Sequence, residues 1–93
     1  MMDEKTRTDI SRRLASAAGH LKGIQRMVDD DAYCIDVIQQ IEAVQSALHK
    51  VSTMVLDNHL HTCVTAAIRG DDPDEREQLL REVTSVFALS ARR

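Results

Sequence analysis

The sequence predicts an all-α protein with three helices per chain, of which the central helix is the longest. Apolar residues recur at intervals of three and four along most of the 93 residues, and no stretch alternates as a β-strand does. Gly, Pro and Asp residues at a few positions mark the expected helix ends. A chain of this length is expected to form a single domain, residues 1–93, with a core small enough to need a metal, a disulfide or a partner subunit.

The first helix is predicted over residues 5–28, where apolar residues follow a helical spacing. Gly19 and Gly23 lie four residues apart on it, and each lowers helix propensity by roughly 1 kcal/mol relative to Ala. Close approach of another backbone is therefore expected at these glycines. The acidic run at residues 29–31 then supplies a turn, and one of its last two residues, Asp30 or Asp31, is expected to cap the next helix.

A second helix is predicted from Ala32 to Arg69, because no Gly or Pro interrupts the chain before Gly70. Such a helix would extend about 57 Å, whereas a compact chain of this size has a radius of gyration of only about 12 Å. An apolar stripe with heptad spacing runs along it and needs a partner helix, so we expect an obligate helical oligomer. The stripe comprises Val37, Ile41, Val44, Leu48, Val51 and Val55.

A third helix is predicted after Gly70, which is expected to end the second helix. Asp72 has the position of an N-cap, Pro73 that of the first helical residue and Glu75 that of a capping-box acid. The third helix is expected to bury five apolar side chains, those of Leu79, Leu80, Val83, Val86 and Phe87.

Basic residues are concentrated in the first 28 residues, although the whole chain carries a net charge of -3. That segment holds six Lys or Arg against three acidic residues, whereas residues 29–91 hold four against twelve. The basic side chains form either the solvated face of an amphipathic helix or a surface that contacts nucleic-acid phosphates.

The composition also indicates a compartment and a use for the thiols. Apolar runs are short and the first ten residues carry charges of both signs, so we expect neither a membrane span nor a secretory signal, and a cytoplasmic location. Because the cytosol keeps thiols reduced, the two cysteines are expected to bind metal or to sense redox state.

The segment NHLHTC, residues 58–63, holds two of the four histidines and one of the two cysteines. On a helix, His59 and Cys63 share a face because they are four residues apart. Cys34 falls on the same helical stripe but about 37 Å away along the axis, so the three cannot meet within one chain. An antiparallel helix from a second subunit, related by a two-fold axis near residues 47 to 48, would bring Cys34 beside the partner's His59 and Cys63.

Two thiolates and one imidazole form a soft ligand set that suits Cu(I). Structural Zn(II) usually takes four ligands, and Ni(II) or Co(II) would take more nitrogen or oxygen donors. In the alternative interpretation, both cysteines are inert core residues and His59 is a solvated helix residue.

The stretch GHLKGIQRMVDDDAYCIDVIQQIEAVQSAL, followed by NHLHTCV, resembles the copper-sensing branch of the copper-sensitive operon repressor family, whose relatives include nickel/cobalt and formaldehyde repressors. The resemblance covers residues 10–88. It implies an antiparallel four-helix-bundle dimer that assembles into a dimer of dimers. It also implies that the protein without metal binds operator double-stranded DNA and releases it when Cu(I) occupies intersubunit sites.

Residue by residue, the resemblance assigns the triad of Cys34, His59 and Cys63 as metal ligands and Tyr33 as an outer-shell tyrosine. An outer-shell glutamate of the last helix falls at the pair Glu77–Gln78, and Glu77 is the acid there.

The resemblance assigns DNA contacts to Arg13 and Lys50. Three further basic residues, Arg12, Lys22 and Arg26, join them on charge and helical position alone. His20 lies on the same basic helix, where a packing role and a role in the DNA-binding face are both open.

A Cu(I)-responsive transcriptional repressor is therefore the leading hypothesis. The alternatives are a repressor of the same fold that senses thiol oxidation or persulfides through Cys34 and Cys63, one that senses Ni(II), and a copper carrier without DNA binding. Met2 occupies the region where the nickel/cobalt branch uses an additional histidine, which disfavours the nickel alternative. An enzyme is least expected, because no nucleophile, base and orienting group fall together.

Overall fold

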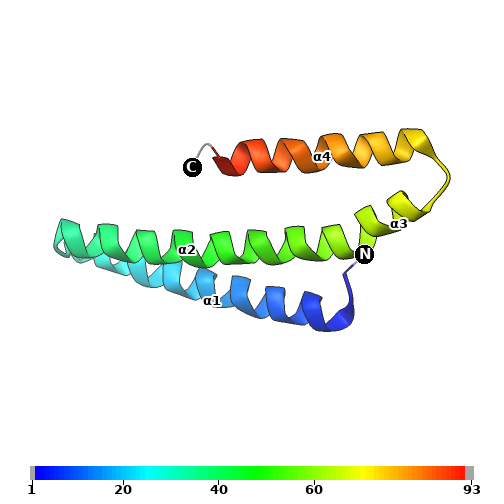
Figure 1. Cartoon of the computed structure of the whole chain (residues 1–93). Coiled ribbons are helices and arrows are strands. Elements are labelled where there is room, and N and C mark those ends of the chain that lie inside the picture. The colour runs from blue at the N-terminus through cyan, green and yellow to red at the C-terminus, as the bar shows by residue number, and fades with distance from the viewer. Residues whose placement is uncertain (1, 92–93) are drawn as a thin grey trace. The chain divides into compact units, whose positions relative to one another are not determined.

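The computed structural model of the chain describes residues 2–91, apart from the side chains of residues 63, 64, 90 and 91. All regular structure in this part of the chain is helical (Figure 1), which confirms the predicted all-α class. Among the described residues, none of the helices combines the length and the apolar character needed to cross a membrane. The chain divides into two compact units, of which one comprises Met2–Asp57 and the other begins at Asn58.

The first unit begins with α1, Glu4–Asp29, whose N-cap is Asp3. The Asp3 carboxylate accepts a hydrogen bond from the Thr6 backbone N–H at 3.3 Å. Hydrogen bonding from the Thr6 side chain and backbone lowers the pKa of the Asp3 carboxyl from its ordinary value, because these donors favour the charged form. The start of α1 is therefore fixed by a side-chain cap one residue before the first helical residue.

The acidic run after α1 ends this helix and does not start the next one. Asp31 has a left-handed backbone conformation, with a φ of 59°. Its N–H donates to the Val28 carbonyl at 3.1 Å, and the Ala32 N–H donates to the Met27 carbonyl at 2.9 Å. This pair of bonds is the Schellman motif, in which the left-handed residue is usually glycine. The prediction that Asp30 or Asp31 caps the second helix was therefore wrong, since both belong to the C-terminal motif of α1.

The second helix, α2, spans Cys34–His59 and lies antiparallel to α1 (Figure 1). The two helices pack through buried residues that recur every seven positions, as expected for a seam between two helices. A hydrogen bond of 2.7 Å between His20 Nε2 and Gln40 Oε1 links the helices beside this seam. The buried seam residues are Ile10, Ala17 and Ile24 on α1 with Val44 and Val51 on α2.

The predicted heptad stripe of α2 is divided between two faces of the helix. One half of the stripe, which includes Val44 and Val51, is used within the chain against α1. The other half remains partly exposed: Ile41, Leu48 and Val55 keep 41%, 40% and 37% of their surface accessible. One half of the stripe therefore packs against α1 of the same chain, and the other half keeps an accessible apolar surface.

A second exposed apolar column runs along α1, also with seven-residue spacing. Its side chains are 45% to 59% exposed. On each helix the exposed apolar residues lie four positions after the buried seam residues. His20 and Gln40 instead lie four positions before the seam residues Ile24 and Val44. Because His20 and Gln40 bond to each other, the two apolar columns lie together on the opposite side of the seam. We call this surface the apolar face; it comprises Leu14, Leu21, Val28, Ile41, Leu48 and Val55.

The predicted close approach at the glycines of α1 is not made within the described chain. Apart from the adjacent residues and the local backbone of α1, no atom of the described chain lies within 4 Å of the position that a Cβ would take at Gly19 or Gly23.

The second unit contains a π-helix, Leu60–Val64, and the short α3, Thr65–Arg69. The prediction of one uninterrupted helix over residues 32–69 was therefore wrong. Two threonine hydroxyls donate to main-chain carbonyls at the interruption, Thr62 to Asn58 at 2.8 Å and Thr65 to Leu60 at 2.9 Å. β-branched side chains at the interruption lower helix propensity.

The last helix, α4, spans Pro73–Ala91. The Asp72 carboxylate accepts hydrogen bonds from the backbone N–H groups of Asp74 at 3.0 Å and Glu75 at 3.4 Å, which confirms Asp72 as the N-cap. Within this unit, α3 and α4 contact each other, and both contact the π-helix. The apolar residues predicted to be buried on α4 are only partly covered: Leu80 and Phe87 remain 56% and 54% exposed.

Candidate metal centre and nucleic-acid face

Cys34 is the first residue of α2 and carries an exposed, free thiol. It lies where the backbone N–H groups of a helix N-terminus are directed, a position that favours anionic ligands. Tyr33 precedes it and is 68% exposed, and its carbonyl accepts the first hydrogen bond of the helix, from the Val37 N–H at 3.2 Å. The predicted thiol ligand is thus accessible at the end of a rigid element.

His59 is the last residue of α2 and is half-buried, and Cys63 lies within the π-helix. The side chain of Cys63 is outside the described residues. A π turn closes its hydrogen bond five residues away, so residues four apart still lie within about one turn. The backbone therefore keeps the two predicted ligands near each other despite the interruption.

The separation of Cys34 from His59 excludes a site within one chain. The two residues occupy the opposite ends of the continuous helix α2, which at about 1.5 Å per residue places them roughly 37 Å apart. Among the described side chains, no group of three His, Cys, Asp or Glu residues could hold a metal ion. A site that uses all three predicted ligands requires a second copy of the chain.

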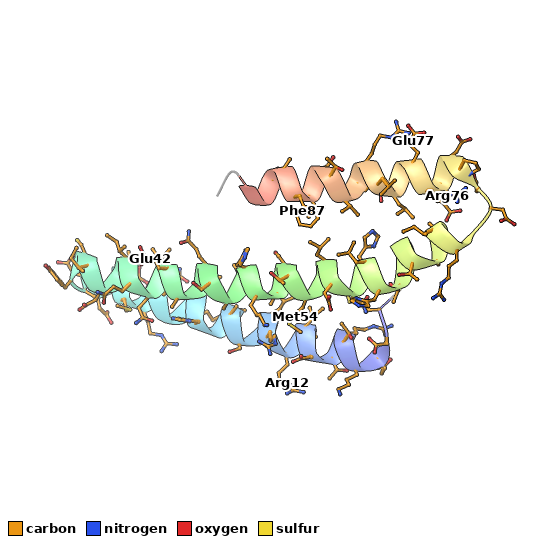
Figure 2. The ribbon with its side chains drawn as sticks, in the orientation of Figure 1. Arg12, Glu42, Met54, Arg76, Glu77 and Phe87 are labelled. Atoms are coloured by element: carbon orange, nitrogen blue, oxygen red, sulfur yellow. The ribbon has the colours of Figure 1, made fainter. Side chains whose placement is uncertain are left out.

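The predicted outer-shell acid lies on α4 and is exposed (Figure 2). Glu77 forms an ion pair with Arg81 at 3.8 Å, and the Gln78 amide donates to Glu82 at 3.4 Å. Both contacts remain within α4, so an outer-shell role for Glu77 and Tyr33 stays a prediction.

Two of the five predicted DNA contacts lie on one side of the α1–α2 seam, opposite the apolar face. Arg13 lies four residues before the buried Ala17, and Lys50 lies one residue before the buried Val51. Both heptad positions lie on the same side of the seam. Both side chains are exposed, and the Arg13 Nε donates to the Asp9 carboxylate at 3.3 Å. We call the group of Arg13, His20, Gln40 and Lys50 the polar strip.

The other three basic residues lie elsewhere on α1. Arg12 projects from α1 on the side away from α2 (Figure 2). Lys22 and Arg26 fall in the heptad columns opposite the seam, and both are exposed. The structure therefore separates these three residues from Arg13 and Lys50.

Sequence reasoning missed Gln40 as a residue of this surface. The available signal was positional, because Gln40 precedes the seam valine Val44 by four residues, as His20 precedes Ile24. The hydrogen bond between the two polar residues makes that relation visible.

These features are typical of one class of protein, an all-α, metal-responsive regulator. Soft donors are placed at the two ends of one helix, an apolar face is available for a second copy, and basic side chains lie on the other side. A family model described as metal-sensitive transcriptional repressor matches residues 6–88, and the chain belongs to this family. The family is one of transcriptional regulators, not of enzymes.

Individual relatives agree with this assignment. The chain is 41% identical over 83 residues to the copper-sensing transcriptional repressor CsoR of Bacillus subtilis (strain 168). The alignment covers 89% of this chain and 79% of that protein. It is 46% identical over 79 residues to the protein of the same name from Mycobacterium tuberculosis (strain ATCC 25618 / H37Rv). This second alignment covers 84% of this chain and 66% of the longer relative. The recognised resemblance to copper-sensing repressors is thereby confirmed.

A solved structure shares the fold. The copper-sensing repressor CsoR with Cu(I) from Geobacillus thermodenitrificans NG80-2 aligns with a TM-score of 0.87 at 37% identity. The alignment covers 98% of this chain and 92% of that one.

Proposed function

We propose that this protein is a Cu(I)-responsive transcriptional repressor. Without metal it binds operator double-stranded DNA, and it releases the DNA when Cu(I) binds at sites formed by Cys34 of one subunit with the partner's His59 and the partner's Cys63. The observation that carries the proposal is the placement of a free thiol and an imidazole at opposite ends of α2, in a chain whose relatives are named copper-sensing repressors.

The apolar face supports assembly into a dimer. Six aliphatic side chains on one side of the α1–α2 pair remain 37% to 59% exposed, and a contiguous apolar surface of this kind favours a protein interface. Packing two such faces against each other would give an antiparallel four-helix bundle. A two-fold axis near residues 47 to 48 would then bring Cys34 level with the partner's His59, and the dimer would contain two metal sites.

The chemistry of the donors supports Cu(I). When bound, Cu(I) would link the thiolates and the imidazole of two subunits, since soft thiolate ligands select this ion. Cys34 would anchor the site from the start of α2, and His59 and Cys63 from the interrupted end of the partner's α2. The residues themselves therefore tie the end of one helix to the opposite end of its partner.

The polar strip supports DNA binding on the other side of the helix pair. Arg13 and Lys50 would neutralise phosphates of the bound duplex. Metal and DNA binding are then linked, because a ligand that weakens operator affinity by some factor is itself bound more weakly by the same factor in the presence of operator. A tetramer built from two dimers would extend the strip along the DNA.

A titration tests this proposal. Operator binding by the reduced protein is measured by fluorescence anisotropy without metal and with Cu(I), Ni(II) or a polysulfide donor. We expect Cu(I) alone to release the DNA, and a Cys34→Ala variant to remain bound at the same Cu(I) concentration. Unchanged operator affinity in the presence of stoichiometric Cu(I) would contradict the proposal, and release by polysulfide alone would support a thiol sensor.

A further inference from the structure

The polar strip contains a contact between the helices that neither the metal site nor the basic residues explain. His20 Nε2 and Gln40 Oε1 are 2.7 Å apart. Because an amide oxygen can only accept, the imidazole Nε2 is the donor. The two N–H donors of the Gln40 amide have no partner among the described residues, and the side chain is exposed. The imidazole thus fixes the orientation of an amide group whose donors are directed to solvent.

This contact also shows which residues of α1 and α2 lie at the same height along the helix pair. In the antiparallel pair, residues whose numbers add to about 60 lie at the same height, as His20 and Gln40 do. Arg13 and Lys50 are therefore within about one turn of each other along the pair. The amide of Gln40 lies seven residues, or about 10.5 Å, from the level of Arg13, which is the rise of about three base pairs at roughly 3.4 Å each.

We propose that Gln40 is a DNA-binding residue of this protein, oriented by His20, and that it donates a hydrogen bond from its amide to a phosphate of the duplex bound by Arg13 and Lys50. This inference rests on the proposed repressor function and adds an uncharged contact to it. Gln side chains are among the ordinary donors to DNA phosphates, where they fix register without reading sequence.

The charges along the strip explain why an uncharged donor fits at this level. The strip carries the basic side chains of Arg13, which is paired with Asp9, and of Lys50. Towards Gln40 its charged groups are acidic, because Asp36 lies one turn before Gln40 and the acidic run at residues 29–31 follows at the end of the pair. A duplex lying along the helices therefore passes from attractive to repulsive surface near Gln40. A neutral donor held by His20 maintains contact at this boundary, and the apolar face lies on the other side of the pair and leaves the strip open in the dimer.

The test compares Gln40 with Gln39, its neighbour on α2, which is exposed and lies on the side of the helix away from α1. The probe is a fluorescein-labelled duplex that the metal-free wild-type protein enriches from a random-sequence pool. Affinity is measured over a range of salt concentrations for Gln40→Ala and Gln40→Glu, with Gln39→Ala and Gln39→Glu as matched controls. Gln40→Glu keeps an acceptor for His20 but has no amide donors.

We expect Gln40→Ala to bind at least about tenfold more weakly than Gln39→Ala, because a dimer loses two hydrogen bonds to charged phosphates. The slope of log affinity against log salt should stay unchanged, since no cation is removed. Gln40→Glu should bind more weakly than Gln39→Glu, although both add the same charge.

Equal affinities within each matched pair would overturn the inference. It would also be overturned if Gln40→Ala bound weakly while Gln40→Glu matched Gln39→Glu, because the bond to His20 would then only brace the helices. Both results leave the repressor function intact. Failure of the wild-type protein to enrich any duplex would instead contradict the proposed function itself.

Discussion

Replacing Leu48 with Asp is expected to prevent dimerisation. Leu48 is 40% exposed in the single chain and lies beside the proposed two-fold axis, so a dimer brings its two copies together. Burying the exposed 40% of the Leu48 surface stabilises the dimer by about 1 kcal/mol per copy, because full burial of a leucine contributes about 1.5–3 kcal/mol. Two carboxylates about 4 Å apart repel by about 4 kcal/mol at an effective dielectric constant of about 20.

These terms add to about 6 kcal/mol per dimer, which raises the dimer dissociation constant by about four orders of magnitude. Sedimentation equilibrium measures the constant directly. The matched control is Ser46→Asp, which places the same charge two residues away at an exposed position that faces neither α1 nor the apolar face. A Leu48→Asp chain that dimerises as tightly as Ser46→Asp would refute the assignment of the apolar face and of the axis.

Four further predictions concern the site and the stability of the chain. Cys34→Ala should abolish the Cu(I) response in DNA-binding titrations while size-exclusion chromatography shows an intact dimer. Arg13→Ala and Lys50→Ala should each weaken operator binding and lower the salt slope by about 2 per dimer, since each phosphate contact contributes about 0.9; unchanged slopes would exclude the polar strip. Asp31→Gly should raise stability in urea denaturation by about 0.5–1 kcal/mol, because glycine adopts the left-handed conformation without steric cost; a loss of stability would contradict this. Since the pKa of Asp3 is lowered in the folded chain, its cap is complete above the ordinary carboxyl pKa and is lost as the pH falls through the lowered value, which an NMR titration of the Thr6 amide should detect.

The sequence predicted most of the helices, because their signals are local. Asp72 and Pro73 mark the start of α4, and the helix begins at Pro73 with Asp72 as its N-cap. The acidic run after α1 was misinterpreted because aspartate serves both as an N-cap and, less commonly, in a left-handed position. Which role it takes depends on bonds from residues 31 and 32 back into α1, and a spacing pattern contains no information about these bonds.

The sequence predicts a set of metal ligands, and this set stays a prediction, but the sequence does not predict the surroundings of these residues. The spacing of Cys34, His59 and Cys63 already excluded a site within one chain. The π-helix was not predictable, because no Gly or Pro marks it and threonine hydroxyls bond to main-chain carbonyls in the regular helices α2 and α4 as well. The division of the heptad stripe was hidden for a similar reason: a pattern of apolar residues shows that a surface is covered, but not whether α1 or a second chain covers it.

Each proposed metal site is shared between two subunits, and a mixed dimer tests this arrangement most directly. Cys34→Ala and Cys63→Ala chains are co-expressed with different affinity tags, and the mixed dimer is isolated and titrated with Cu(I) against a competing chelator. One site of this dimer would lack both thiols, whereas the other would combine the intact Cys34 of one chain with the intact His59 and Cys63 of the other. We expect one tightly bound Cu(I) per mixed dimer and none in either homodimer of a variant; a mixed dimer without a tight site would contradict the shared metal site.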